Sequence, residues 1–278
     1  MFRSTVRNTT KTLLRSRTVW LVLIVFAFIM IRRGVQPHVL YMPGYEPLHI
    51  SFRDFAMELS VAVYTGLDYP LPIFTVVATV LVLNRDCGDS FFEVEKAAGV
   101  KPSRYLLGRM CAVAAVSFAA QWILSFVELQ LAVYNRSSLE GYTLPRYLGL
   151  SVYRLTYVNL CTALPTILFY IGFVYLIGML FRNGIAATVG GFAYTMISYY
   201  GWSHFRREID AEIYVGYINP LAEKLRNYFM YQGLEDEQKW LAVGDTSLLK
   251  ALIAIGILVI ACVCCSLLSY LLVRKREV

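Results

Sequence analysis

The sequence is poor in charge. Asp, Glu, Lys and Arg make up only 16% of its 278 residues, whereas 58% are hydrophobic, and the mean hydropathy is +0.55. An average soluble domain carries about 25% charged residues, so this deficit excludes an ordinary soluble fold. The composition is typical of an integral membrane protein.

Histidine and the motifs of common enzymes are also scarce. The three histidines, His38, His49 and His204, show no H-E-x-x-H or other paired ligand spacing, and no G-x-S-x-G motif occurs. We therefore expect no catalytic residue, no metal site and no cofactor site on this chain. The phosphate-binding pattern G-x-x-x-x-G-K-S/T is absent as well. If the protein uses ATP, a separate chain must bind the nucleotide.

The six cysteines do not suggest a disulfide framework. Cys87 falls in a charged segment between two apolar runs, and the other five fall inside apolar runs. None lies in a segment that we place outside the cell, where disulfides form and persist. We expect free thiols.

Long apolar runs recur along the chain. A membrane-spanning helix needs about 20 apolar residues. We count six such helices in one transmembrane domain that covers residues 1–278, so the predicted fold class is an all-α polytopic membrane protein. The second span is extended back to Val61 despite Pro70 and Pro72, which we expect to kink it. The expected bounds are 18–33, 61–84, 105–134, 155–181, 185–201 and 248–273.

The distribution of Lys and Arg predicts the orientation. These residues are densest in short segments before the first span, between the second and third spans, and after the last span. The positive-inside rule then places both termini in the cytoplasm, although Arg32 and Arg33 oppose it. The first apolar run has no small-residue cleavage site, so we expect no cleavable signal peptide.

Residues 1–17 have an amphipathic pattern. Phe2, Val6 and Leu13 share one side of a helix, whereas the basic residues occupy the other side. This pattern predicts an interfacial helix on the anionic inner leaflet, in contact with membrane lipid. The alternative is a disordered basic tail.

The segment 86–104, between the second and third spans, is charged and well capped. Ser90 and Glu93 match the S-x-x-E capping box, and Gly99 is placed to end the helix in the left-handed conformation, with Pro102 following. The pattern predicts a helix of residues 90–98, which is too short to persist alone in water. It must therefore pack against something.

The two sides of this short helix differ. Phe92, Glu93 and Lys96 lie opposite the apolar face that contains Phe91. A large aromatic ring on the polar side of a cytosolic helix indicates a socket on a partner protein. The alternative is that the helix is buried against the inner ends of the chain's own spans.

The outer segment 202–246 is long and more polar than the spans. Asn219 is a candidate N-cap with Pro220 at the first helical position, and apolar residues follow at helical spacing. We expect a second amphipathic helix, on the extracellular side, before the last span.

Two groups of residues within the spans are unusual. Gln121 and Glu128 are polar residues in the third span. One interpretation is that they line a substrate path or form a hydrogen bond to another helix. The simpler expectation is that the span ends earlier and that Glu128 reaches the outer surface. In the fifth span, Ala187, Gly190 and Gly191 belong to overlapping small-xxx-small pairs, which let backbones approach closely. Packing within the chain and contact between subunits explain these pairs equally well.

Two short motifs and the overall layout resemble a known family. The run from Phe92-Glu93 to Gly108-Arg109 is similar to a pattern of an acidic residue, a small-residue break, P-x-S/R-R and then G-K/R, and Asn219-Pro220-Leu221 is similar to a common N-P-L motif. The start Arg85-Asp86-Cys87 departs from the usual Glu-Arg. With six spans and a basic N-terminal helix, the chain resembles the membrane subunit of an ATP-binding cassette exporter of the type-2 permease family.

The resemblance implies a function. Residues 90–98 would be a coupling helix that docks through Phe92, Glu93 and Lys96 on a separate ATPase subunit, which binds ATP and magnesium. A second permease subunit, identical or related, would pair with the chain, and the small residues of the fifth span would lie at that contact or line the path. The resemblance implies a bacterial plasma membrane and no nucleic-acid partner. A membrane sensor or assembly scaffold without transport, and an intramembrane enzyme, are the alternatives.

Overall fold

The computed structural model describes residues 2–35, 66–67, 69–86, 99, 102–137, 148–205 and 248–275. Within these ranges the chain forms seven α-helices and no strand, so the fold is all-α. The helices are α1 (Phe2–Arg15), α2 (Arg17–Val35), α4 (Pro70–Asp86), α6 (Pro102–Ser137), α7 (Leu148–Phe181), α8 (Gly184–Phe205) and α11 (Leu248–Lys275).

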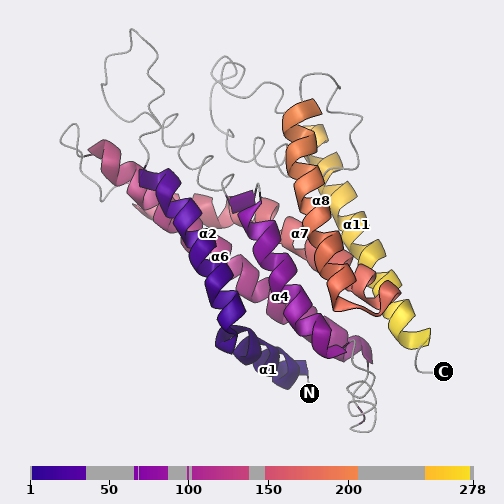
Figure 1. The fold of residues 1–278 in the computed structure, drawn as a ribbon. Coiled ribbons are helices and arrows are strands. Elements are labelled where there is room, and N and C mark those ends of the chain that lie inside the picture. Colours follow the sequence, from indigo (N-terminus) through magenta and orange to yellow (C-terminus); the bar gives the residue numbers. More distant parts are fainter. Residues whose placement is uncertain are drawn as a thin grey trace.

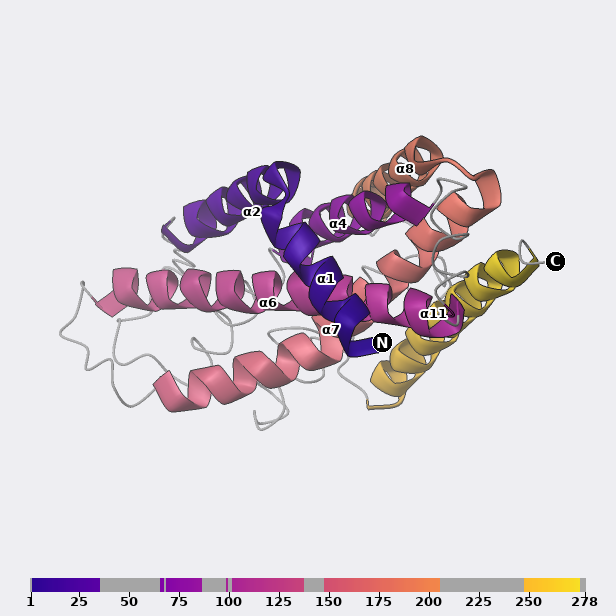
Figure 2. The same cartoon turned by 90° about the horizontal axis from the view of Figure 1, so that it is seen from below.

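The six long helices run between two ends of a bundle (Figure 1). We call one of them the α1 end, because α1 lies there with the C-terminal ends of α4, α7 and α11 and the N-terminal ends of α6 and α8. The opposite end is called the far end. Seen from below, α1 crosses α6, and α4 lies between α2 and α8 (Figure 2). Successive long helices therefore alternate in direction.

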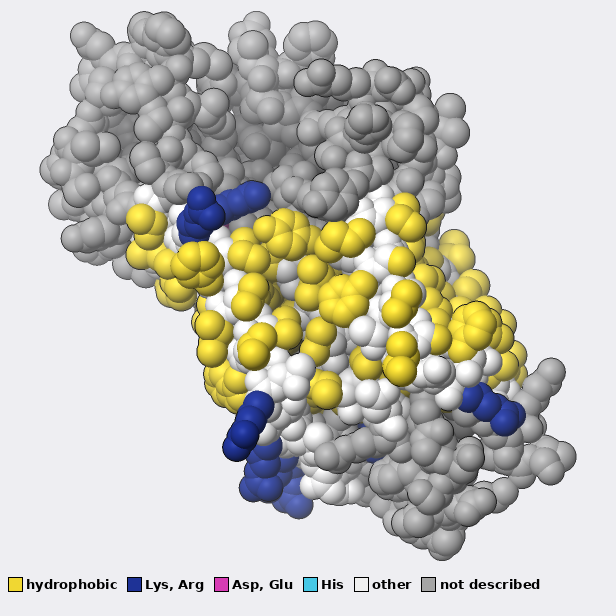
Figure 3. All heavy atoms as spheres, in the orientation of Figure 1, with side chains coloured by type: hydrophobic (Ala, Val, Ile, Leu, Met, Phe, Trp, Pro, Cys, Tyr) yellow, Lys and Arg dark blue, Asp and Glu magenta, His cyan; other side chains and the backbone are white. Residues whose placement is uncertain are grey.

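Three helices in the described part of the chain are long and apolar enough to cross a membrane. They are α2, the stretch Arg104–Ala132 of α6 and the stretch Leu155–Phe181 of α7. Shorter apolar stretches occur in α4, α8 and α11. The space-filling view shows an apolar band on the bundle surface, with Lys and Arg side chains on both sides of the band (Figure 3). A surface of this kind is stable in lipid rather than in water.

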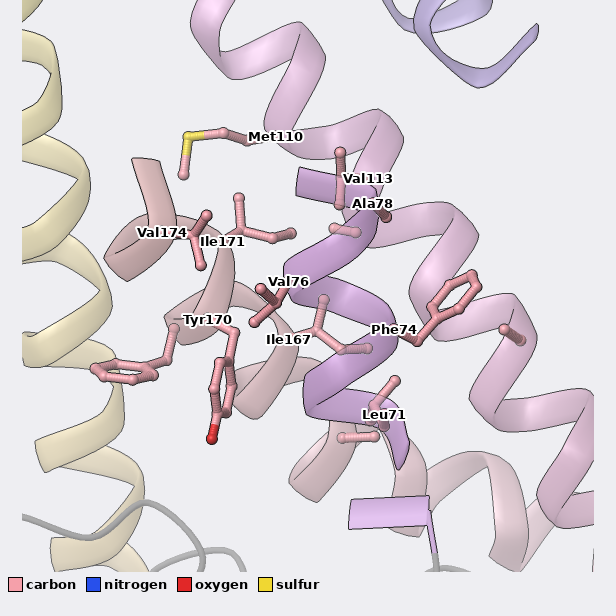
Figure 4. Packing of buried hydrophobic residues seen from close by; sticks show 14 of the residues in the cluster. Leu71, Phe74, Val76, Ala78, Met110, Val113, Ile167, Tyr170, Ile171 and Val174 are labelled. Atoms are coloured by element: carbon pink, nitrogen blue, oxygen red, sulfur yellow. The ribbon is translucent and has the colours of Figure 1, made fainter. Parts of the chain in front are cut away.

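The core of the bundle is built around α4, which packs against α2, α6, α7 and α8. Its Phe74 ring lies 6.2 Å from the Phe26 ring of α2, between ring centroids. Figure 4 shows Val76 on another side of α4, pointing toward Ile171 and Val174 of α7. Every side chain of α4 from position 70 to 83 is buried or half-buried, and none is charged. Any displacement of α4 must therefore be shared with its neighbours.

The N-terminal segment is helical, as predicted, and the alternative of a disordered tail is wrong. Leu13 and, one turn earlier, Thr9 are buried, whereas Arg3, Arg7 and Lys11 are exposed, as the predicted amphipathic phase requires. Val6 is half-buried, and Phe2, at the start of the predicted apolar side, is exposed. The helix packs against α6. A break at Ser16 separates α1 from α2.

The start of α4 can be compared with the sequence expectation only over part of the predicted span. Helix α4 begins at Pro70, and the backbone N–H of Ile73 donates to the carbonyl of Tyr69, 3.0 Å away. Residues 66 and 67 are also helical, and the expected start of the second span at position 61 stays a prediction. Both prolines stand in the first turn, where the missing N–H groups cost little. Residues 61–65 lie outside the described residues.

The later helices follow the predicted spans and extend beyond them. Helix α6 covers the expected 105–134, and α7 covers 155–181 with Pro165 inside an unbroken helix. The chain turns tightly at Arg182-Asn183-Gly184, between α7 and α8, with Arg182 at φ 52°. The Asn183 side chain accepts a hydrogen bond from the Ile185 N–H at 2.8 Å, which caps the start of α8.

The cysteines within the described residues are free thiols, as predicted. Cys111 and Cys264 are exposed, and Cys161, Cys262 and Cys265 are partly buried. Cys87 lies outside the described residues.

Candidate functional site

The predicted docking residues Phe92, Glu93 and Lys96 lie outside the described residues, and so does the predicted extracellular helix near Asn219. Of the capped segment, Gly99 is described. It is exposed and has φ 70°, which is the left-handed conformation predicted for the residue that ends the helix. The described part of the candidate site therefore lies on the two helices that flank this segment, α4 and α6.

Arg109 joins these two helices at the α1 end. Its side chain is only 6% exposed, and its Nη1 donates a hydrogen bond of 2.9 Å to the Val82 carbonyl in the last turns of α4. The guanidinium also lies over the Tyr105 ring, 4.4 Å from the ring centroid. A cation near the C-terminal end of a helix is stabilised by the helix dipole. Arg109 therefore connects α6 to the end of α4 across the intervening segment.

The two residues after Val82 contact two further helices. Leu83 is fully buried and fills a notch at Gly178 of α7, because a Cβ at position 178 would collide with its side chain. The Asn84 side chain lies against Gly184, at the start of α8, in the same way. We call residues 82–84 the α4 hub, since Val82, Leu83 and Asn84 contact α6, α7 and α8 in turn.

Helix α1 packs beside the hub on α6. A Cβ at Gly108 would lie 3.2 Å from the Cβ of Thr5 and 3.5 Å from the Phe2 ring. The absence of a side chain at Gly108 thus lets α1 approach the α6 backbone next to Arg109. The α1 end is consequently a compact junction of α1, α4, α6, α7 and α8.

The small residues of α8 pack within the chain. Ala187 is fully buried, and a Cβ at Gly191 would lie 2.7 Å from Cγ1 of Val76 in α4 and 3.2 Å from Cγ2 of Val174 in α7. A Cβ at Gly190 would lie 2.7 Å from Ile177 Cδ1 of α7. The small-xxx-small pairs thus bring α8 close to α4 and α7. Their contact with a second subunit or a path stays a prediction.

The polar residues of α6 form one buried stripe. Ser117, Gln121, Ser125 and Glu128 follow at spacings of three and four and are at most 1% exposed. Nε2 of Gln121 donates to Ser125 Oγ at 2.9 Å. The side chain of Gln121 also lies against Gly66, where a Cβ would collide with it. Polar groups inside a span are costly, so a continuous stripe of them is a candidate for function.

The expectation that the third span ends before Glu128 is corrected by the structure. Helix α6 continues to Ser137, and Glu128 is 1% exposed rather than at the surface. Helix α2 comes close to α6 at this point, because a Cβ at Gly34 would lie 2.9 Å from the Glu128 backbone oxygen. The absence of a side chain at Gly34 lets the two backbones meet beside Glu128.

Sequence reasoning missed the structural role of Arg109 and of Gly178. Gly108-Arg109 attracted notice only as the end of a family-like run, and Gly178 has no local signal at all. No group of three His, Cys, Asp or Glu side chains suited to a metal ion occurs within the described part of the chain.

No protein-family model matches the chain, and no curated protein matches it significantly.

Proposed function

We propose that the chain is the transmembrane permease subunit of an ATP-driven exporter of the ATP-binding cassette type. It crosses a bacterial plasma membrane six times, through α2, α4, α6, α7, α8 and α11, with the α1 end in the cytoplasm. The ATP is bound by a separate ATPase subunit, which docks on the segment between α4 and α6. A second permease subunit, identical or related, completes the transporter.

Support for six spans comes from the alternating directions of the six long helices, which all carry an apolar stretch. Support for the orientation comes from the basic residues that gather at the α1 end. Arg3, Arg7, Lys11 and Arg104 are exposed there, and Arg182 lies in the turn between α7 and α8. The positive-inside rule assigns such an end to the cytoplasm.

The observation that carries the proposal is the fixed frame around the capped segment. Arg109 holds the α6 start to the α4 end with a buried hydrogen bond, and the hub ties this joint to α7 and α8. A segment that emerges from so rigid a joint can transmit a push from a docked ATPase to the spans. A flexible tether would absorb such a push instead.

Docking is tested with the double variant Phe92→Ala with Glu93→Arg. An ATPase that carries a G-x-x-x-x-G-K-S/T loop and is encoded beside this chain should co-purify with the wild-type chain in stoichiometric amount. We expect the variant to lose most of the bound ATPase, because it removes an aromatic anchor and reverses a charge at the contact.

The matched control is Phe91→Ala, which changes the neighbouring ring on the opposite side of the predicted helix. It should retain the ATPase. Equal recovery of the ATPase with the wild type and the double variant would contradict docking at Phe92. An ATPase that fails to bind even the wild type would favour a sensor or scaffold.

A further inference from the structure

We propose that the α4 hub is a rigid coupling joint, and that Arg109 is the positioning residue that makes α4 and α6 move as one body. The inference rests on the proposed function, because the joint matters when a docked ATPase displaces the segment between the two helices. It goes beyond that function by naming the contacts that carry the displacement and the helices that share it.

Arg109 is suited to this role by its chemistry. Its guanidinium is buried, so leaving its N–H groups without acceptors would be costly, and the hydrogen bond to the Val82 carbonyl is charge-assisted. The planar group stacks on Tyr105 at the same time. A lysine ammonium offers neither the planar fork nor the stacking surface. The joint therefore depends on arginine at this position, and charge alone does not replace it.

The joint extends past α6 because the next two residues of α4 engage α7 and α8. Leu83 sits in the notch at Gly178, and Asn84 lies against Gly184. Close packing of this kind transmits displacement with little compression. A push on the segment after Asp86 should consequently move α4, α6, α7 and α8 together, rather than tilt the second and third spans alone.

The test measures an internal distance in the full chain, reconstituted in lipid nanodiscs with the ATPase. Spin labels are placed at Ile123 of α6 and Ile197 of α8, which are both exposed and belong to helices that do not pack extensively against each other. We expect one narrow distance distribution in the wild type, unchanged between the nucleotide-free and the vanadate-trapped state. In Arg109→Met the distribution should broaden or shift on trapping, because α4 no longer carries α6 with it.

Amide hydrogen exchange supplies a second readout that needs no ATPase. Loss of a hydrogen bond to a charged group should speed exchange in the last turn of α4 about tenfold in Arg109→Met. Arg109→Lys should not restore the wild-type rate. Arg104→Met, which removes an exposed arginine from the same helix, is the matched control and should leave the exchange rate and the distance unchanged.

Tyr105→Leu keeps the hydrogen bond from Arg109 to the Val82 carbonyl and removes the ring on which the guanidinium stacks. This variant replaces Arg109→Met in both measurements if Arg109→Met does not fold. We expect a smaller change in the same direction. The inference is overturned if Arg109→Met, or Tyr105→Leu in its place, matches the wild type in both readouts, or if the wild-type distance itself changes on trapping. If the ATPase does not bind the wild-type chain, the proposed function fails, and the exchange rates alone decide whether the joint exists.

Discussion

Gly191→Ala should lower the free energy of unfolding of the detergent-solubilised chain by about 1–3 kcal/mol. The added methyl group would lie 2.7 Å from Val76 Cγ1, 3.0 Å from Val76 Cγ2 and 3.2 Å from Val174 Cγ2. Val76 and Val174 are fully buried and β-branched, so neither can turn away. The measurement is the midpoint of thermal unfolding at fixed detergent and protein concentration.

Gly256→Ala is the matched control, because it makes the same change within α11, where no atom lies within 4 Å of the new Cβ. We expect it to be neutral or to stabilise the chain by up to about 1 kcal/mol, through the better helix propensity of alanine. An unchanged midpoint for Gly191→Ala would show that α8 does not pack on α4 and α7 as described. A fall that depends on protein concentration would instead point to a subunit contact.

The second large effect is expected at Glu128. Glu128→Lys would place an ammonium group at a site that is 1% exposed, within the candidate span Arg104–Ala132. Because a buried charge without a suitable partner is costly, we expect a loss of about 3 kcal/mol or more, and little folded protein in membranes. The yield of monodisperse protein after size-exclusion chromatography, with its unfolding midpoint, measures the effect.

The charge reversal Arg104→Glu provides the comparison, since Arg104 is exposed on the same helix. It should alter stability by no more than about 0.5 kcal/mol. If Glu128→Lys folds as well as Arg104→Glu, the carboxylate is in contact with water or headgroups, and the sequence expectation of a side chain at the outer surface is restored.

Periodicity and capping predicted the elements well. The helical N-terminal segment and the left-handed conformation of Gly99 each depend on a few neighbouring residues, and the structure confirms both. Local signals were sufficient because a helical pattern and a C-cap are determined within one or two turns of chain.

Contacts between segments that lie far apart in the sequence could not be predicted from local patterns. The approach of α2 to the α6 backbone at Glu128 depends on Gly34, and the notch for Leu83 depends on Gly178, which are each more than ninety positions away. The sequence around a glycine within an apolar run does not indicate which other helix will pack against that glycine. Gly108-Arg109 likewise gave no sign that the guanidinium would be buried against α4. The joint at the α1 end therefore emerged only from the folded chain.

The proposed function requires that this chain couple the ATPase encoded beside it to movement of the spans. The most direct measurement is the ATP hydrolysis rate of that ATPase, alone and after reconstitution with the chain in nanodiscs. We expect a rate that rises several-fold with the wild-type chain and returns to the rate of the ATPase alone with Phe92→Ala and Glu93→Arg combined. A rate that is the same with and without the wild-type chain would show that the chain does not couple the ATPase to its spans.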